Sequence, residues 1–405
     1  MTTNKLSLID RIADAQQRIT DLLLHQCEYG AQTKLLPPEF AACGQFVGGD
    51  AEAIQQYGLH GISAALRVLG ACQSDECRRI VKRLVSFCEA SFGVNHAYVV
   101  RPKFTGMGDS QNVIKLGELL YGLSFVTTAQ ADRGPLVQHI ADRLKTCIVD
   151  DRGWGYFLDE TEVELLPTAY AVRGLAQNGF NSDIRGVRKS LLESLAARAH
   201  SSDTSAVDVT TAVACTYCLT FCLGADSEDS VLEDTFLSTW RSLEPLLSED
   251  IEQNVEYWRG KVTHYLRIPF QLYLLALASK YSQRRLAGFR AQRRLNSIID
   301  ALRSTSFKYP YSGAYLSSRT NGIAYDALAA IRERARNVVY LHLAYGADYV
   351  RGLAGSRPVR VIAAILAGLV ICYSIRQWAL TGKLADLAPE LLAGFVTLIL
   401  AWARR

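Results

Sequence analysis

Residues 57–70 read YGLHGISAALRVLG, and residues 77–90 read CRRIVKRLVSFCEA. As a helix, the first segment is apolar or small-residue-rich on nearly every side, whereas the second gathers its charges on one face. A helix of the first kind must be covered all round, and a helix of the second kind can face water on one side. This pair therefore predicts one inner and one outer helix of an all-α fold.

The same alternation returns six times along the chain. Segments of the inner kind begin at Tyr57, Lys115, Pro167, Thr210, Ile268 and Asn321. Segments of the outer kind begin at Cys77, Pro135, Val187, Leu232, Arg285 and Asn337. The inner segments recur about every 40 to 60 residues, a period typical of stacked helical pairs.

Six helix pairs predict an (α/α)6 toroid, in which an outer layer of helices encloses an inner one. An open solenoid is the competing architecture, because stacking neighbouring pairs also buries one face of each helix. Neither end of the repeat region carries an obvious polar capping repeat, and this favours closure. We expect an N-terminal helix and lead-in over residues 1–44, the toroid over 45–355, and a membrane-anchoring hairpin over 356–405.

The C-terminal region contains two strongly apolar runs, VIAAILAGLVICYSI at 361–375 and LLAGFVTLILAW at 391–402. The first can span a bilayer if the flanking arginines extend toward the head groups, while the second is shorter. Basic residues precede the first run and follow the second, so both ends are expected in the cytoplasm. We expect a two-helix transmembrane hairpin in the inner (cytoplasmic) membrane with the body facing the cytoplasm. The alternative is a buried helical hairpin that completes the core.

The composition describes a globular chain: 49% of the residues are hydrophobic and 21% are charged. These shares exclude a disordered or fibrous protein. Ten cysteines are scattered along the chain, and the N-terminus reads as a polar amphipathic helix, so we expect reduced thiols. The net charge of +4 gives no argument for binding nucleic acid, and we expect none.

Residues 148–180 read IVDDRGWGYFLDETEVELLPTAYAVRGLAQNGF. This stretch resembles a repeat of the prenyltransferase and squalene-cyclase superfamily, where a Gly-Trp-Gly turn precedes an inner helix beginning Pro-Thr-Ala. Gly153 and Gly155 would permit the tight turn, Trp154 would pack between helix pairs, and Pro167 would open the helix without losing a hydrogen bond. The resemblance implies a toroid that handles an isoprenoid or a similar lipid.

The sequence departs from that superfamily at both of its catalytic centres. A terpene cyclase of this type uses an Asp-rich DxDDTA motif as its acid; aligned on Thr211 and Ala212, this chain has Val207, Asp208, Val209 and Thr210 there. The zinc site of protein prenyltransferases needs Asp, Cys and His. Here Asp75 and Cys77 fall on an outer helix with no suitable histidine. We expect no metal and no cofactor, and catalysis, if any, of a terpene-cyclase-like or prenyltransferase-like kind.

Candidate site residues follow from helix periodicity and from the segment 256–273, where basic and aromatic residues meet. The catalytic candidates are Asp208, His264 and Asp326. The ligand-binding candidates are Tyr170, Trp258, Arg259, Tyr265, Arg267, Gln271 and Tyr325. Periodicity also turns His60, Glu118 and Tyr121 inward. Arginine beside aromatic rings suits an anionic head group with an apolar tail, although the same residues could simply pack between repeats.

Two functions remain open at this point. The first is a membrane-anchored cytosolic toroid that binds or processes an isoprenoid or other lipid-like ligand, without an intact DxDD or zinc centre. The alternative is a non-catalytic sensor, effector or scaffold that signals through its transmembrane hairpin. The expected partners are membrane lipid, a prenyl or terpenoid ligand, and, for the alternative, a second protein.

Overall fold

The computed structural model describes residues 8–32, 37–44, 58–94, 111–199, 206–222, 229–244, 247, 253–258, 261–286, 288–303 and 318–335. The chain divides into two units, Met1–Asn337 and Val338–Arg405, and all described residues belong to the first. The hairpin predicted at 356–405 and the helix predicted from Asn337 lie outside the described residues. Within the described ranges, no helix is both long and apolar enough to cross a membrane.

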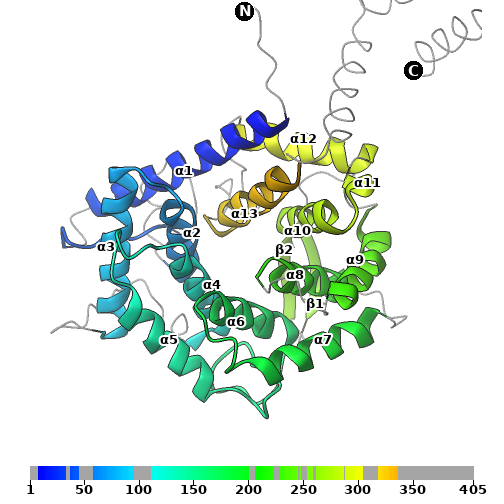
Figure 1. The fold of residues 1–405 in the computed structure, drawn as a ribbon, viewed down its shortest axis with the longest axis horizontal. Helices are drawn as coiled ribbons and strands as arrows, with labels where there is room; N and C mark the ends of the chain where they lie inside the picture. Colours follow the sequence, from blue (N-terminus) through cyan, green and yellow to red (C-terminus); the bar gives the residue numbers. More distant parts are fainter. Residues whose placement is uncertain are drawn as a thin grey trace, which may run out of the picture. The chain divides into compact units, whose positions relative to one another are not determined.

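Six helices match the six predicted inner segments. They are α2 (Leu59–Gly70), α4 (Val113–Ser124), α6 (Leu165–Gln177), α8 (Ala206–Cys222), α10 (Arg267–Tyr281) and α13 (Ser318–Ala335). Almost every residue of α2, α4 and α6 is buried. Each of the six helices contacts the next in this order, and α13 contacts α2, so the contacts form a closed cycle (Figure 1).

The amphipathic helices lie outside this cycle (Figure 1). They are α3 (Asp75–Phe92), α5 (Gly134–Thr146), α7 (Arg185–Ala199), α9 (Asp229–Leu243), α11 (Gln283–Leu286) and α12 (Phe289–Arg303). The prediction of a single outer helix that begins at Arg285 is wrong in its extent. Two helices, α11 and α12, replace it, and Gly288 lies between them. Helix α1 (Leu8–Gln32) packs against α12, α13, α2 and α3 and so takes an outer position as well.

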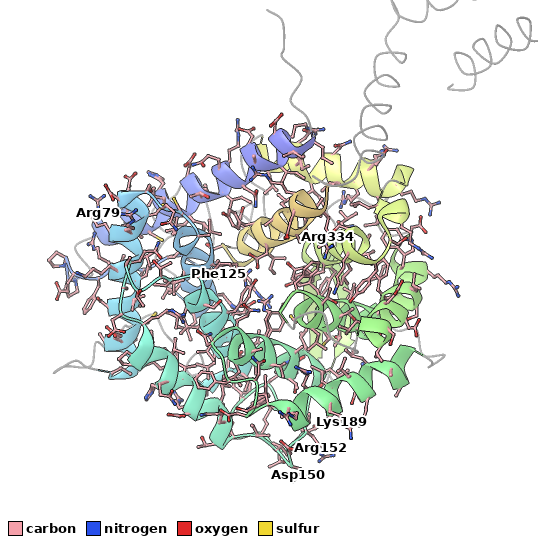
Figure 2. The ribbon with its side chains drawn as sticks, in the orientation of Figure 1. Arg79, Phe125, Asp150, Arg152, Lys189 and Arg334 are labelled. Carbon is pink, nitrogen blue, oxygen red and sulfur yellow. The ribbon has the colours of Figure 1, made fainter. Side chains whose placement is uncertain are left out.

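Charged side chains follow the outer edge of this arrangement. Figure 2 shows Arg79, Arg152 and Lys189 there, on the side away from the inner helices. Arg79 pairs with Glu28 of α1 at 3.1 Å, and Arg152 pairs with Asp150 at 3.0 Å. Exposed pairs of this kind contribute roughly 0–1 kcal/mol each. The burial of the inner helices therefore dominates the stability of the fold.

Two glycines allow α4 and α6 to touch backbone to backbone. A Cβ atom added to Gly117 would lie 2.5 Å from the carbonyl oxygen of Tyr170, and one added to Gly174 would lie 2.5 Å from that of Gly117. Real Cβ atoms do not approach an oxygen so closely, so both positions need glycine for steric reasons. This close crossing sets the separation of the two helices that carry much of the site described below.

The turn before α6 confirms the local roles predicted for its residues. Trp154 is buried and donates a hydrogen bond from Nε1 to the carbonyl oxygen of Leu144 in α5 at 2.8 Å. The Thr168 hydroxyl accepts from the Trp154 amide at 3.0 Å and donates to the Trp154 carbonyl at 3.2 Å. Gly153 has φ of +148°, a conformation that favours glycine. Pro167 stands in the first turn of α6, where it removes no helical hydrogen bond.

One element is not helical, and the sequence analysis missed it. Strands β1 (Gln253–Trp258) and β2 (Lys261–Leu266) pair antiparallel, with Gln253 opposite Leu266 and Trp258 opposite Lys261. Their valine, threonine and aromatic residues are of the types that favour strands. β2 runs directly into α10, so the first part of the segment 256–273 belongs to a hairpin that immediately precedes the fifth inner helix. Apart from this hairpin, the regular structure of the described residues is helical, as predicted.

Candidate functional site

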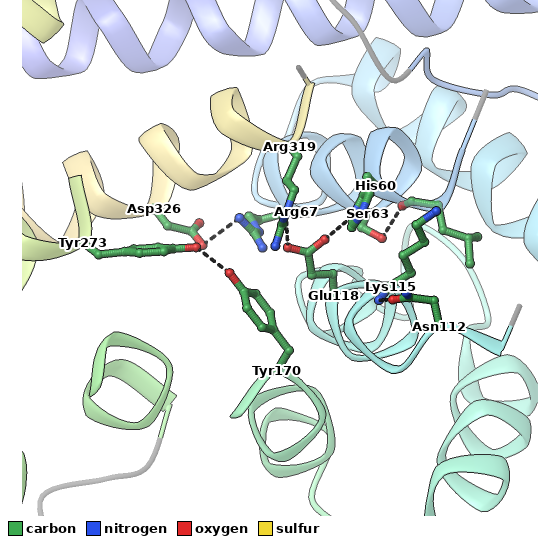
Figure 3. Close-up of polar contacts among 11 residues, drawn as sticks. His60, Ser63, Arg67, Asn112, Lys115, Glu118, Tyr170, Tyr273, Arg319 and Asp326 are labelled. Carbon is green, nitrogen blue, oxygen red and sulfur yellow. Dashed lines mark hydrogen bonds and ion pairs between the residues drawn. The ribbon is translucent and has the colours of Figure 1, made fainter. Parts of the chain in front are cut away.

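All six inner helices contribute to one group of polar and aromatic side chains, which we call the central cluster. Figure 3 shows the part of it that lies around Glu118 and Asp326. Its members are His60 and Arg67 of α2, Glu118 and Tyr121 of α4, Tyr170 and Arg173 of α6, Tyr217 of α8, Tyr273 of α10, and Arg319 and Asp326 of α13. Hydrogen bonds, ion pairs and ring contacts connect these residues into a single network.

Helical spacing explains why these side chains share a face. His60 and Arg67 are seven residues apart, as are Arg319 and Asp326, and two helical turns return nearly to the same side. Tyr121 follows Glu118 by three residues, and Arg173 follows Tyr170 by three. Such pairs are neighbours along one face of a helix. Each helix therefore presents its polar residues as a set.

Glu118 is the most tightly held acid of the cluster. Its Oε2 lies 2.5 Å from Nδ1 of His60, and its Oε1 accepts a hydrogen bond of 2.8 Å from Nε of Arg319. Only 2% of the Glu118 side chain is exposed, against 16% for His60 and 32% for Arg319. Burial by itself would raise the pKa of Glu118, but the charge of Arg319, together with the close contact with His60, holds it well below its usual range. Glu118 is therefore ionised at neutral pH.

His60 is neutral under the same conditions. Burial lowers the pKa of its imidazole, and the nearby Glu118 carboxylate only partly offsets that effect. A neutral imidazole has one N–H, and the short contact with Glu118 assigns it to Nδ1. Nε2 then keeps its lone pair. Among the residues that the structure describes, none is hydrogen-bonded to this second nitrogen.

Asp326 forms the second buried ion pair of the cluster. Its Oδ2 lies 3.3 Å from Nη1 of Arg67, and both side chains are less than a tenth exposed. Burial raises the pKa of Asp326, while the positive charges of Arg67 and Arg173 act in the opposite direction. The Arg67 guanidinium also stands over the Tyr121 ring at 4.7 Å from the centroid. Asp326 is thus a buried acid that faces a cation.

Aromatic rings surround the arginines. Arg173 stands over the Tyr121 ring at 3.8 Å and over the Tyr170 ring at 5.1 Å, and Arg319 stands over Tyr170 at 5.4 Å. The Tyr170 and Tyr273 hydroxyls are 2.9 Å apart, and the Tyr273 ring packs against Tyr217 with centroids 4.3 Å apart. Cation–π contacts of this kind stabilise a guanidinium that has left water. The result is a cationic and aromatic interior.

The structure places two of the predicted catalytic or ligand-binding residues, Tyr170 and Asp326, in the central cluster. It also places there the three further residues that periodicity turned inward, His60, Glu118 and Tyr121. Gln271 is buried but accepts a 2.8 Å hydrogen bond from Nε of Arg294, so its amide faces the outer helix α12. Tyr325 is half-buried, and its electrostatic neighbours include Asp326, Arg332 and the thiol of Cys72.

The remaining predicted site residues cannot be compared with the cluster. Asp208 belongs to α8, Trp258 to β1, His264 and Tyr265 to β2, and Arg267 to α10, and the side chains of all five lie outside the described part of the chain. Arg259 itself lies outside the described residues.

The sequence analysis missed the three arginines of the cluster. Arg173 is the only charged residue of α6, and Arg67 is the only arginine, lysine or acid of α2. A lone charge on an otherwise apolar helix must find a partner inside the protein, because an unpaired buried charge is costly. That signal was present in the sequence. Arg319 gave no such signal, since α13 carries several charges.

Two pairs of residues with metal-ligating side chains lie close together in the sequence. Asp75 and Cys77 stand at the beginning of the outer helix α3, as predicted. The spacing of Cys215 and Cys218 puts both thiols on one helical face, and both are buried among apolar residues of α8. Across the ranges that the structure describes, no three His, Cys, Asp or Glu side chains gather closely enough to hold a metal ion.

Comparison with known proteins adds no identification. No protein-family model matches the chain, and no curated protein matches its sequence.

Proposed function

We propose that this chain is an (α/α)6 toroid that binds an isoprenoid or another lipid-like ligand with an anionic head group. In this proposal residues 356–405 form a transmembrane hairpin in the inner membrane, and the toroid lies on the cytoplasmic side. The closed cycle of contacts from α2 round to α13 supports the toroid. The apolar runs at 361–375 and 391–402 support the anchor. A ligand that is poorly soluble in water would then reach the toroid directly from the membrane.

One observation carries the choice of an anionic head group. Arg319 uses Nε to bind Glu118, while neither Nη1 nor Nη2 has a hydrogen bond or ion pair with any residue that the structure describes. Its side chain is 32% exposed, more than any other ion-paired side chain of the central cluster. A guanidinium presents its donors as a planar fork that matches a carboxylate or a phosphate. The fork of Arg319 is already oriented by Glu118 and by the Tyr170 ring.

The buried acids argue for binding rather than for cyclase chemistry. A cyclase of the resembled superfamily must hold a carboxylic acid protonated so that it can donate to an alkene. Glu118 is ionised because Arg319 and His60 surround it. Asp326 is the better acid candidate, since burial raises its pKa, but the 3.3 Å contact with Arg67 favours its ionised form. We therefore propose no turnover by either described acid.

The proposal can be tested by native mass spectrometry of the full chain extracted in detergent, followed by identification of the bound lipids. We expect an anionic prenyl or similar lipid to stay bound to the wild-type protein. Arg319→Lys should retain the ion pair with Glu118 but lose the fork, and so weaken binding by about tenfold or more. Arg78→Lys, at an exposed pair with Asp75 on α3, is the matched control and should bind as the wild type does.

The same measurement addresses the alternative function, a sensor, effector or scaffold that acts through the hairpin. That function predicts that no lipid stays bound and that a protein partner is retained instead. Absence of bound lipid from the wild-type protein, or equal lipid binding by the wild type and Arg319→Lys, would count against the ligand-binding proposal.

A further inference from the structure

The segment that contains α11 and α12 is the most basic part of the outer layer. Residues 283–303 contain six arginines and one acid, Asp300. Helix α7 follows with four basic residues and one acid, whereas α1 and α9 each carry more acidic than basic residues. Positive charge is therefore most concentrated on the α11–α12 segment.

Helix α12 turns two of these arginines toward the solvent. Arg290 and Arg293 are exposed, and their spacing of three residues makes them neighbours on one face of the helix. Arg294 instead points into the body, where its Nε donates to Gln271 at 2.8 Å. The apolar residues of the helix are buried as well, namely Ala291, Leu295, Ile298 and Ile299. We call Arg290 and Arg293 the basic face of α12.

The basic face has no acid beside it among the described residues. No ion pair joins Arg290 or Arg293 to a carboxylate in that part of the chain, and two like charges three residues apart weaken a helix. Exposed basic residues of other outer helices have a partner within the same helix: Arg78 with Asp75, Lys145 with Asp142, and Lys189 with Glu193. The basic face therefore does not stabilise the fold, which favours a role in contact with an external anion.

Contacts through α1 place α12 close to the end of α13. Arg11 of α1 binds Asp300 of α12 at 2.9 Å. Five residues further along α1, Gln16 accepts a 3.3 Å hydrogen bond from Nη1 of Arg332, in the last turn of α13. Five residues rise about 7.5 Å along a helix, so α12 and the end of α13 lie beside neighbouring turns of α1 (Figure 1). The chain that follows α13 leads to residues 356–405.

We propose that the basic face of α12 lies against the head groups of an anionic membrane once residues 356–405 have inserted. This inference rests on the anchor of the proposed function and adds an orientation of the body. A bilayer is favoured because it is an extended anionic surface, and each basic residue near it strengthens attachment by about fivefold. Two arginines alone hold a protein weakly, so anchoring still depends on residues 356–405.

The test measures how fast phenylglyoxal modifies single arginines of the full chain in lipid nanodiscs. One set of discs contains only zwitterionic phosphatidylcholine, and the other also contains anionic phosphatidylglycerol. Peptide mapping gives the rate at each site. We expect Arg290 and Arg293 to react about fivefold or more slowly in the anionic discs. Arg185, exposed on α7 on the far side of the inner helices from α12, should react equally in both (Figure 1).

Salt and charge reversal give two further measurements. The slowing should weaken as the ionic strength rises from about 0.05 M to about 0.5 M, because salt screens exposed charges. In Arg293→Glu, the new carboxylate would pair with Arg290 and repel the lipid, so the slowing of Arg290 should fall by about twofold or more. Arg185→Glu is the matched control and should leave the slowing of Arg290 unchanged.

The possible failures can be told apart. If the chain is retained in the discs but Arg290 reacts equally in both kinds, this inference is overturned and the anchor stands. If the chain is retained in neither kind of disc, the anchor is overturned and this inference with it. Equal slowing of Arg185 and Arg290 by anionic lipid would also overturn it. So would slowing of Arg290 by added RNA or by an acidic protein in place of anionic lipid.

Discussion

Glu118 shows how single residues organise the interior. It binds His60, 58 residues earlier in the sequence, and Arg319, 201 residues later, and so connects α2, α4 and α13. The free-energy cost of removing the Glu118 carboxylate from water is offset only while both partners remain in place. Removing the charge of Glu118 should therefore weaken the contact between the beginning and the end of the described unit.

Glu118→Gln tests this role through the pH dependence of stability. The folded pKa of Glu118 lies below its unfolded value of about 4.3, so its contribution is complete above the unfolded value and is lost progressively as the pH falls from there toward the folded pKa. At pH 7 we expect the variant to be less stable by about 1–3 kcal/mol, because charged hydrogen bonds to His60 and Arg319 become neutral ones. The difference from the wild type should shrink below about pH 4.

Unfolding midpoints of the detergent-extracted protein at pH 7 and at pH 3.5 would measure both effects. The control is Glu193→Gln on α7, where Glu193 forms an exposed pair with Lys189 at 3.9 Å and should contribute little. His60 acts in the same direction as Glu118: burial lowers its folded pKa, so its contribution is also lost as the pH falls, below about 6.5. A gap between wild type and Glu118→Gln that stays constant from pH 7 to pH 3.5 would contradict this account.

At the scale of elements, the crossing of α4 and α6 controls where the cluster forms. These helices supply Glu118, Tyr121, Tyr170 and Arg173, and Gly117 and Gly174 bring their backbones together. The close approach leaves no room for a side chain at either glycine. A change in the spacing of these two helices should therefore disturb both the packing and the cluster.

Gly117→Ala is the corresponding prediction. The new methyl group would have to displace the carbonyl of Tyr170, and overpacking of this kind typically costs about 1–3 kcal/mol. Alanine has a higher helix propensity than glycine, which by itself would stabilise the variant. A loss of stability would therefore be due to the steric clash. Gly134→Ala, at the beginning of α5, is the matched control, because its nearest neighbour would be a flexible Asp132 oxygen at 3.4 Å.

Thermal unfolding would compare the two alanine variants with the wild type. We expect a lower midpoint for Gly117→Ala and an unchanged or higher one for Gly134→Ala. Equal midpoints for both variants would show that α4 and α6 can separate without cost.

For the whole molecule, the decisive question is whether residues 356–405 hold the protein at a membrane. The sequence supports this through two apolar runs with basic residues outside them. We expect the full chain to float with lipid vesicles in a density gradient, and to resist extraction by alkaline carbonate. A chain that ends at residue 355 should remain in the soluble fraction. If the shortened chain also floats, the membrane contact lies in the body and not in residues 356–405. If the full-length protein stays in the soluble fraction, these residues do not anchor it.

The sequence by itself determined where the six inner helices of the described region lie. The six inner helices were located to within a few residues, because a helix that is apolar on all sides can only be buried. It also determined the turn around Trp154, since the constraints there are local: a glycine with positive φ, an indole with one donor, and a proline in a first helical turn.

Only the tertiary structure decided which residues meet. Helix periodicity shows which face of a helix is buried, but not which distant face lies opposite, so the pairing of Glu118 with Arg319 and of Arg67 with Asp326 could not be read from spacing. The outer position of α1 and the β hairpin before α10 were decided in the same way. Each depends on contacts between separate segments, and those contacts form only when the chain packs.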